Sequence, residues 1–158
     1  MNVAHLDGVL ADRGRWNAPP RCSIARAMDV VGNRSTALLM REAYYGTTRF
    51  DDFARRVGIT EAAAAARLKD LLSAGLLARE PYREPGQRTR QQYVLTDMGR
   101  DLMPALLALM QWGDTYLADE NGPPLALEHT DCGAPVAVSV RCAKGHEVAL
   151  DELTVRRA

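Results

Sequence analysis

Two histidines and two cysteines in the last third of the chain have the residue types and spacing of metal ligands. His129 and Cys132 form one pair, and Cys142 and His146 form a second pair on the other side of an expected hairpin. Tetrahedral zinc accepts two imidazoles and two thiolates, so these four side chains are candidate zinc ligands. The alternative is a capping hairpin that binds no metal. The spacing of these four residues is a less specific signal for zinc than two paired C-x2-C motifs. No other cofactor is expected.

The third cysteine, Cys22, stands where a helix is expected to begin, next to Arg21 and near Arg26. A helix N-terminus and nearby cations both favour a thiolate, so Cys22 is a candidate sensor of oxidants or electrophiles. The alternative is a small side chain buried in a subunit interface. Three cysteines make an odd count, and no basic and apolar leader segment begins the chain. We therefore expect free thiols and a cytoplasmic protein.

A polar, turn-rich segment at 83–90 separates two expected antiparallel strands, Leu76–Tyr82 and Gln91–Leu95. It carries three arginines, Arg83, Arg88 and Arg90. Such side chains can lie along phosphates or enter a narrow minor groove and read its width. The segment is therefore typical of the wing of a DNA-binding domain.

The segment between Thr60 and Gly75 carries its own helix boundaries. Thr60 can cap the helix, Glu61 suits its first turn, and Gly75 can adopt the left-handed conformation that ends it. Three- and four-residue spacing predicts a buried face of Ala64, Leu68, Leu71 and Leu72. The residues expected to face outward are Ala62, Ala65, Ala66 and Lys69. This small, smooth face would allow another macromolecule to approach closely.

Shorter helices are expected before this segment, at 22–31, then from a cap at Ser35 or Thr36 to Gly46, and at 50–57. Because a turn of only a few residues separates the third helix from Thr60, the pair forms a helix-turn-helix. Arg49 directly precedes the third helix.

A longer helix, Asp97–Leu117, carries two adjacent apolar stripes. One stripe can cover its own domain, and the second predicts contact with the same helix of a symmetry mate. Pro104 removes a backbone donor and predicts a bend.

The chain is expected to have three parts. Residues 1–20 form a flexible arm, residues 21–117 a winged helix-turn-helix domain that includes a dimerisation helix at 97–117, and residues 118–158 a small C-terminal β appendage. In the appendage, alternating valines at 136–140 predict a hairpin, and 151–155 a further strand. The fold class is mainly α with small β, that is, α+β.

Composition fits one domain of ordinary size, with 158 residues and 47% apolar residues. Formal charge is zero, but residues 21–117 carry +3 and residues 118–158 carry −3. A basic surface is compatible with this distribution, whereas general binding to polyanions is not. The longest apolar run, Leu102–Met110, is shorter than the roughly 20 residues that cross a bilayer, so no membrane span is expected. Enzyme signatures such as a phosphate-binding glycine loop or G-x-S-x-G are absent, and the three histidines are scattered.

From about Cys22 to Gly113, the chain resembles the HxlR family of winged helix-turn-helix transcriptional regulators, relatives of the MarR group. The segments that carry the resemblance are Cys22, Gly32-Asn33-Arg34, Leu39-Met40-Arg41-Glu42, Gly46, Arg49-Phe50-Asp51-Asp52-Phe53, Arg67-Leu68-Lys69-Asp70-Leu71, Gly75-Leu76, Tyr93-Val94-Leu95-Thr96, Gly99 and Trp112-Gly113. The resemblance implies a cytoplasmic homodimer, joined through its terminal helices, that binds pseudo-palindromic operators on double-stranded DNA. It also implies the sensor role of Cys22, because some HxlR-like regulators use a cysteine at this position. Repression is expected because a small dimer can act by occupying a promoter.

The candidate DNA-binding residues lie on the helix from Thr60, before the third helix, and on the wing. They are Arg49, Thr60, Glu61, Ala62, Ala65, Ala66, Arg67, Lys69, Arg83, Arg88, Arg90 and Gln91. The alternative is a winged-helix module that binds protein without specific DNA binding. The sequence leaves the operator and any small-molecule or oxidant effector open.

Overall fold

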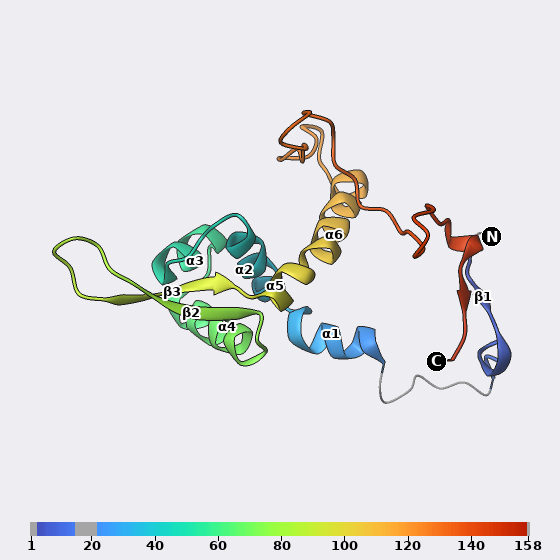
Figure 1. Ribbon diagram of the computed structural model, residues 1–158, viewed down its shortest axis with the longest axis horizontal. Helices are drawn as coiled ribbons and strands as arrows, with labels where there is room; N and C mark the ends of the chain where they lie inside the picture. The colour runs from blue at the N-terminus through green and yellow to red at the C-terminus, as the bar shows by residue number, and fades with distance from the viewer. Residues whose placement is uncertain (1–2, 15–21, 158) are drawn as a thin grey trace. The chain divides into compact units, whose positions relative to one another are not determined.

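The computed structural model describes residues 3–14 and 22–157 (Figure 1). The chain divides into two compact units. The winged-helix unit spans residues 23–109, and the second unit joins residues 3–14 and Cys22 to residues 110–157. The winged-helix unit ends at residue 109, within the dimerisation helix expected at 97–117. In chain order the elements are β1 (His5–Leu6), η1 (Gly8–Leu10), α1 (Ser23–Val31), α2 (Arg34–Tyr44), α3 (Phe50–Val57), α4 (Glu61–Ser73), β2 (Leu77–Tyr82), β3 (Arg90–Leu95), α5 (Asp97–Asp101), α6 (Met103–Tyr116), η2 (Leu150–Glu152) and β4 (Thr154–Val155).

The winged-helix unit has the expected architecture, mainly helical with a small sheet. Helices α2, α3 and α4 pack on one another and on the β2–β3 hairpin, which projects beyond the helices as the wing (Figure 1). The hairpin is antiparallel, and its register runs from Leu77 opposite Leu95 to Tyr82 opposite Arg90. The segment before α3 also contacts the hairpin, because Tyr93 N donates to Thr48 O at 2.8 Å.

The core of this unit is built from the inner faces of α2, α3, α4 and the hairpin. Its buried members are Leu39, Met40, Phe53, Val57, Leu68, Leu71, Leu76, Leu77 and Tyr93. The rings of Phe53 and Tyr93 meet edge to face, with centroids 5.9 Å apart. The core thus fixes the elements on which the candidate DNA-binding residues lie.

The cap of α2 corrects the sequence analysis. Asn33, and not Ser35 or Thr36, is the N-cap, and its side-chain oxygen accepts from Ser35 N at 2.9 Å and Thr36 N at 3.4 Å. Thr36 is buried in the first turn, where its side chain cannot cap the helix. The cap of α4 follows expectation, because Thr60 is its N-cap, and Thr96 caps α5.

The single helix expected at 97–117 is interrupted. Helix α5 ends at Asp101 and α6 begins at Met103, so Leu102 separates them. Pro104 has no N–H to offer the carbonyl of Arg100, and it lies in the first turn of α6, where the missing donor is tolerated. The expected bend is therefore a break between two helices.

The second unit contains little regular structure. Strand β1 pairs in parallel with β4, so part of the arm expected at 1–20 is a strand, while residues 15–20 lie outside the described residues. Of the strand expected at 151–155, only Thr154–Val155 form a strand, β4, because Asp151 and Glu152 lie in the 3-10 helix η2. No strand forms at 136–140, where isolated bridges join Glu128 to Pro135 and Arg141 to Glu147. An isolated two-stranded hairpin is marginal without a covering layer, and the three valines of this segment are exposed.

Across the described ranges, none of the helices combines the length and apolar character that crossing a bilayer requires.

Candidate nucleic-acid interface

Helix α4 presents the smooth face that the sequence predicts. Helix α3 ends at Gly58, whose φ of 70° is left-handed, and the Thr60 hydroxyl accepts from Ala63 N at 3.2 Å to start α4. Ala64, Leu68 and Leu71 are buried. The outward residues are exposed, as expected: Ala62, Ala65, Ala66 and Lys69. Alanine has no hydrogen-bonding side chain, so this face can make apolar contacts, such as those to thymine methyl groups.

The two basic residues of α4 have different surroundings. Arg67 is half-buried, and its Nη1 donates to Asp70 Oδ2 at 2.9 Å. It also borders a small cavity together with Asp29 of α1 and Thr36 of α2. Lys69 is exposed on the alanine face. Lys69 is therefore the better placed of the two cations to meet a ligand on that face, while Arg67 lies on its flank.

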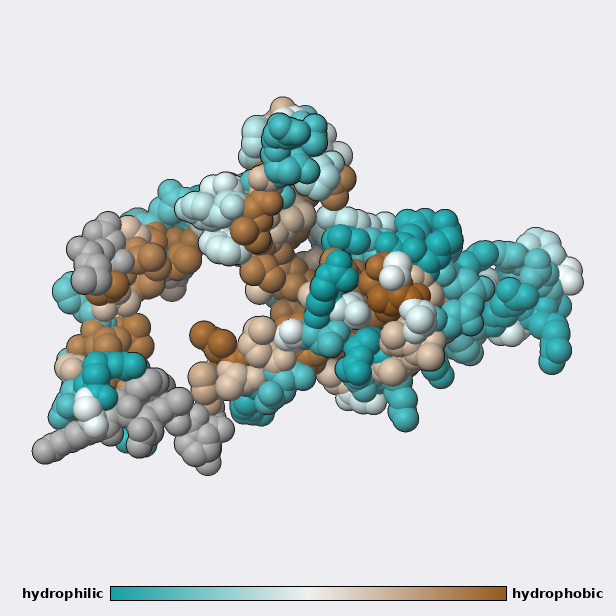
Figure 2. Space-filling model, turned by 180° about the vertical axis from the view of Figure 1, so that it is seen from behind, coloured by the Kyte–Doolittle hydropathy of each residue, from teal (hydrophilic) through white to brown (hydrophobic). Residues whose placement is uncertain are grey.

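The wing carries its arginines in two arrangements. Arg83 Nε donates to Gln87 O at 3.1 Å and so bridges the turn around Gly86. Arg88 and Arg90 are exposed, and no other described residue holds either side chain by a hydrogen bond or ion pair. Figure 2 shows that the projecting wing is strongly hydrophilic. Gln91, the next residue of β3, is exposed as well.

The side chain of Arg49, the N-cap residue of α3, contacts two residues of the hairpin. Its Nη2 donates to Glu84 Oε1 on the wing, and its guanidinium carbon lies 5.2 Å from the centroid of the Tyr82 ring. The hydrogen bond to Glu84, followed by the charge of Glu84, holds the pKa of Arg49 above its usual value. Sequence reasoning missed both partners. The available signal was that Glu84 is the one acidic residue among the arginines of segment 83–90.

The candidate residues therefore fall on two neighbouring surfaces of one unit, the exposed face of α4 and the wing. A family model, HxlR-like helix-turn-helix, matches residues 30–121, more than half of the chain. The chain belongs to the HxlR-like helix-turn-helix family.

Relatives and solved structures agree with this HxlR-like assignment. An uncharacterized HTH-type transcriptional regulator of Mycobacterium tuberculosis is 41% identical over 135 residues, covering 84% of this chain and 83% of the relative. The crystal structure of PA1607, described as a candidate transcription factor, has a TM-score of 0.78 at 34% identity, covering 88% of this chain and 96% of that one. The redox regulator HypR in its reduced form has a TM-score of 0.53 at 29% identity, covering 59% of this chain and 91% of HypR. The HxlR-like chain is thus a transcriptional regulator with a helix-turn-helix DNA-binding domain, and its family and relatives are regulators, not enzymes.

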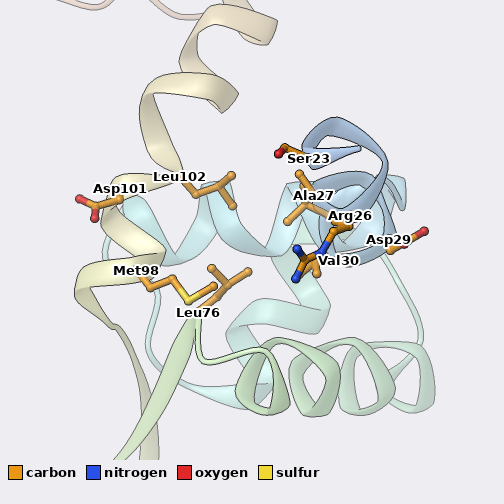
Figure 3. Close-up of a pocket in the computed structure, with 10 residues that line it drawn as sticks. Ser23, Arg26, Ala27, Asp29, Val30, Leu76, Met98, Asp101 and Leu102 are labelled. Carbon is orange, nitrogen blue, oxygen red and sulfur yellow. The ribbon is translucent and has the colours of Figure 1, made fainter. Parts of the chain in front are cut away.

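Cys22 of the HxlR-like chain is half-buried and directly precedes α1. All three cysteines are free thiols. Helix α1 borders a cavity of about 630 Å³ in the winged-helix unit, together with Leu76, Met98 and Leu102 (Figure 3). Asp29 and Asp101 point away from its apolar lining in the close-up. The side chains of α1 that face solvent include Ile24 and Met28, which are 76% and 55% exposed.

The four candidate zinc ligands do not gather at one point. His129 Nδ1 lies 3.2 Å from Cys132 Sγ, in a turn closed by Gly133 N donating to His129 O. Cys142 and His146 lie in a second turn, closed by Cys142 N donating to His146 O. In the described residues, no three His, Cys, Asp or Glu side chains are grouped so that they could hold a metal ion. The structure brings together one pair of the four, and zinc binding stays a prediction that metal analysis of purified protein tests.

Helix α6 carries large apolar side chains that are exposed to solvent. Leu109, Trp112 and Tyr116 are exposed, and the Trp112 and Tyr116 rings lie 5.7 Å apart between centroids. Leu102 and Leu106, nearer the start of the helix expected at 97–117, pack on the core. Figure 2 shows the hydrophobic surface of α6. Several exposed large apolar side chains on one helix are typical of a protein interface.

Proposed function

We propose that this HxlR-like regulator is a cytoplasmic homodimeric repressor that binds a pseudo-palindromic operator by anchoring to phosphates and reading DNA shape. The observation that carries the proposal is the contrast between the alanine face of α4 and the free arginines of the wing. The alanines offer no bidentate hydrogen bonds to base edges, so direct readout is limited to thymine methyl groups and to what Glu61 or Lys69 reaches. Most discrimination then falls to Arg88 and Arg90, on the backbone or in a narrow minor groove.

The dimer is supported by the exposed apolar residues of α1 and α6. Burying Ile24 and Met28 of α1, or Trp112 and Tyr116 of α6, against a second copy would remove large apolar side chains from water. A two-fold dimer presents two copies of α4, and such dimers read half-sites about one helical turn of DNA apart. Two recognition helices so placed would account for a pseudo-palindromic operator.

The experiment removes the two free arginines of the wing together. Arg88→Ala/Arg90→Ala protein is compared with wild type by fluorescence anisotropy, using a duplex that wild-type protein selects from a random library. Affinity should fall, and the slope of log K against log salt should flatten by roughly one unit per lost phosphate contact, counted per protomer. The matched control is Arg156→Ala/Arg157→Ala, which removes the same charge from the second unit and should leave the slope unchanged.

Three outcomes contradict parts of this proposal. An unchanged salt slope in the Arg88→Ala/Arg90→Ala protein rejects phosphate anchoring by the wing. A monomer by light scattering at micromolar concentration rejects the dimer. Wild-type protein that binds no duplex favours the alternative, a winged-helix module for protein partners.

Cys22 remains our candidate for a redox response, and two facts support it. It is a half-buried thiol at the start of α1, and HypR, a redox regulator, shares the fold. If Cys22→Ser protein still loses DNA binding on treatment with diamide, Cys22 is not the sensor.

A further inference from the structure

Arg49 lies where the helix-turn-helix meets the wing. The residue before it, Thr48, accepts a hydrogen bond from Tyr93 N at 2.8 Å, so the chain entering α3 is paired with β3. Arg49 itself is the N-cap of α3 and makes no side-chain capping bond. Its long side chain is therefore available for the wing.

The guanidinium of Arg49 contacts two consecutive parts of the wing. Its carbon lies 5.2 Å from the ring centroid of Tyr82, the last residue of β2. Its Nη2 donates to the carboxylate of Glu84, two positions further along, where the wing loop has begun. A planar guanidinium can stack on a ring and pair with a carboxylate at the same time, which a lysine ammonium cannot match in geometry.

The electrostatic surroundings of Arg49 disfavour a phosphate. Asp51, Asp52 and Tyr82 line the same cavity of about 280 Å³ as Arg49, and so does Arg90, which differs from Arg49 in making no ion pair with a described residue. Glu84 already pairs with the guanidinium, and Asp52 adds further negative charge nearby. A phosphate brought to this place would meet carboxylates that repel it. Arg88 has no such partner in the described chain, so the two arginines are not equivalent.

We propose that Arg49 is a positioning residue, which ties the root of the wing to α3 through Tyr82 and Glu84, and that it is not a phosphate contact. The sequence analysis had grouped Arg49 with the DNA-binding residues. This inference rests on the proposed DNA binding, and it refines which arginines touch the ligand. Held at its root, the wing presents Arg88 and Arg90 in a restricted set of orientations.

Substitution of Glu84 gives the sharpest test, because the two possible roles of Arg49 predict opposite changes in DNA affinity. If Arg49 contacts a phosphate, Glu84→Gln frees it and removes a repulsive charge, so DNA binding tightens. If Arg49 positions the wing, Glu84→Gln removes the ion pair that holds it and weakens binding by about two- to ten-fold. The matched control is Glu80→Gln, which removes an exposed carboxylate of β2 that makes no ion pair with any described residue. Its affinity should stay equal or rise.

Arg49 variants complete the comparison on one probe, a random-sequence 30-base-pair duplex followed by fluorescence anisotropy. Arg49→Lys keeps the charge, so a phosphate contact would survive, whereas a positioning role predicts a loss similar to that of Arg49→Gln. The double variant Arg49→Gln/Glu84→Gln should bind no worse than either single variant, since one tie is broken in all three. Tighter binding by Glu84→Gln, or wild-type affinity in Arg49→Lys, overturns the inference.

Hydrogen exchange of the free protein separates this inference from the proposed function. In Arg49→Gln and Glu84→Gln, amides of residues 82–90 should exchange faster while those of α2 and α4 keep their protection. This measurement needs no DNA, so it tests the tie even if wild-type protein binds no duplex. Unchanged exchange in the wing rejects the positioning role, whereas absence of duplex binding alone rejects only the proposed function.

Discussion

Different forces stabilise the two units of this chain, each taken by itself. In the winged-helix unit, side chains from α2, α3, α4 and the hairpin form a continuous core, and Leu39, Phe53 and Leu68 are fully buried. In the second unit, none of the described residues is buried. Hydrophobic burial is thus confined to the part of the chain that carries the candidate DNA-binding surface.

Hydrogen bonds replace burial in the second unit. Gln111 of α6 makes two of them to one segment, because its Nε2 donates to Val136 O at 2.7 Å and its Oε1 accepts from Val138 N at 2.9 Å. Such bonds compete with water, so each contributes little net stability. The comparison teaches that the candidate DNA-binding surface is fixed by packing, whereas the segment around Val136 and Val138 is held by polar contacts.

Among the variants that test this contrast, one that removes an aromatic ring from the core should have the largest effect on stability. Phe53→Ala loses the edge-to-face contact with Tyr93 and leaves a cavity, so we expect a loss of about 3–5 kcal/mol in the free energy of unfolding. Urea unfolding followed by circular dichroism measures it. Val138→Ala is the control in the second unit, and it should cost less than about 0.5 kcal/mol because Val138 is exposed. Similar values for both variants would contradict the proposed division of forces.

Gln111→Ala should have a smaller and local effect. Losing both bonds frees the segment around Val138, whose amide should exchange about two- to ten-fold faster. The winged-helix core should unfold at the same urea concentration as in wild type. Thr115→Ala is a fair control because its hydroxyl donates only to Gln111 O within α6. Equal exchange at Val138 in both variants would show that Gln111 does not hold the tail.

The same contrast explains what the sequence predicted. The boundaries of α4 are encoded locally by Thr60 and Gly75, and its faces follow from spacing, so both are confirmed except that Leu72 is only half-buried. The cap of α2 was wrong because Asn33, Ser35 and Thr36 are all suitable residues, and local signals do not choose among them.

Long-range contacts left no comparable signal in the sequence. The alternating valines at 136–140 predict a strand only where a face is covered, and here no layer covers them. The parallel pairing of β1 with β4 joins opposite ends of the chain, beyond the reach of any local pattern. The ion pair between Arg49 and Glu84 likewise cannot be predicted from the sequence of α3 or of the wing alone.

The smallest expected effect concerns a charge on the surface of the winged-helix unit. Arg55 donates a hydrogen bond to Asp52 one turn earlier in α3, and this bond holds the pKa of Asp52 below its usual value. Because the folded pKa is lowered, ionised Asp52 contributes stability above the unfolded pKa, and this contribution is lost as the pH falls through the folded pKa. An NMR titration of the Asp52 carboxyl group should therefore give a midpoint below that of an unperturbed aspartate.

Arg55→Gln should return the midpoint of Asp52 toward its usual value, and added salt should do so in part, since the pair is exposed and screened. Arg56→Gln is the matched control, because Arg56 acts on Asp52 only through its charge and should shift the midpoint less. If both variants shift it equally, the hydrogen bond is not the main cause. Asp52 would then respond mainly to the general positive field of the arginines around α3.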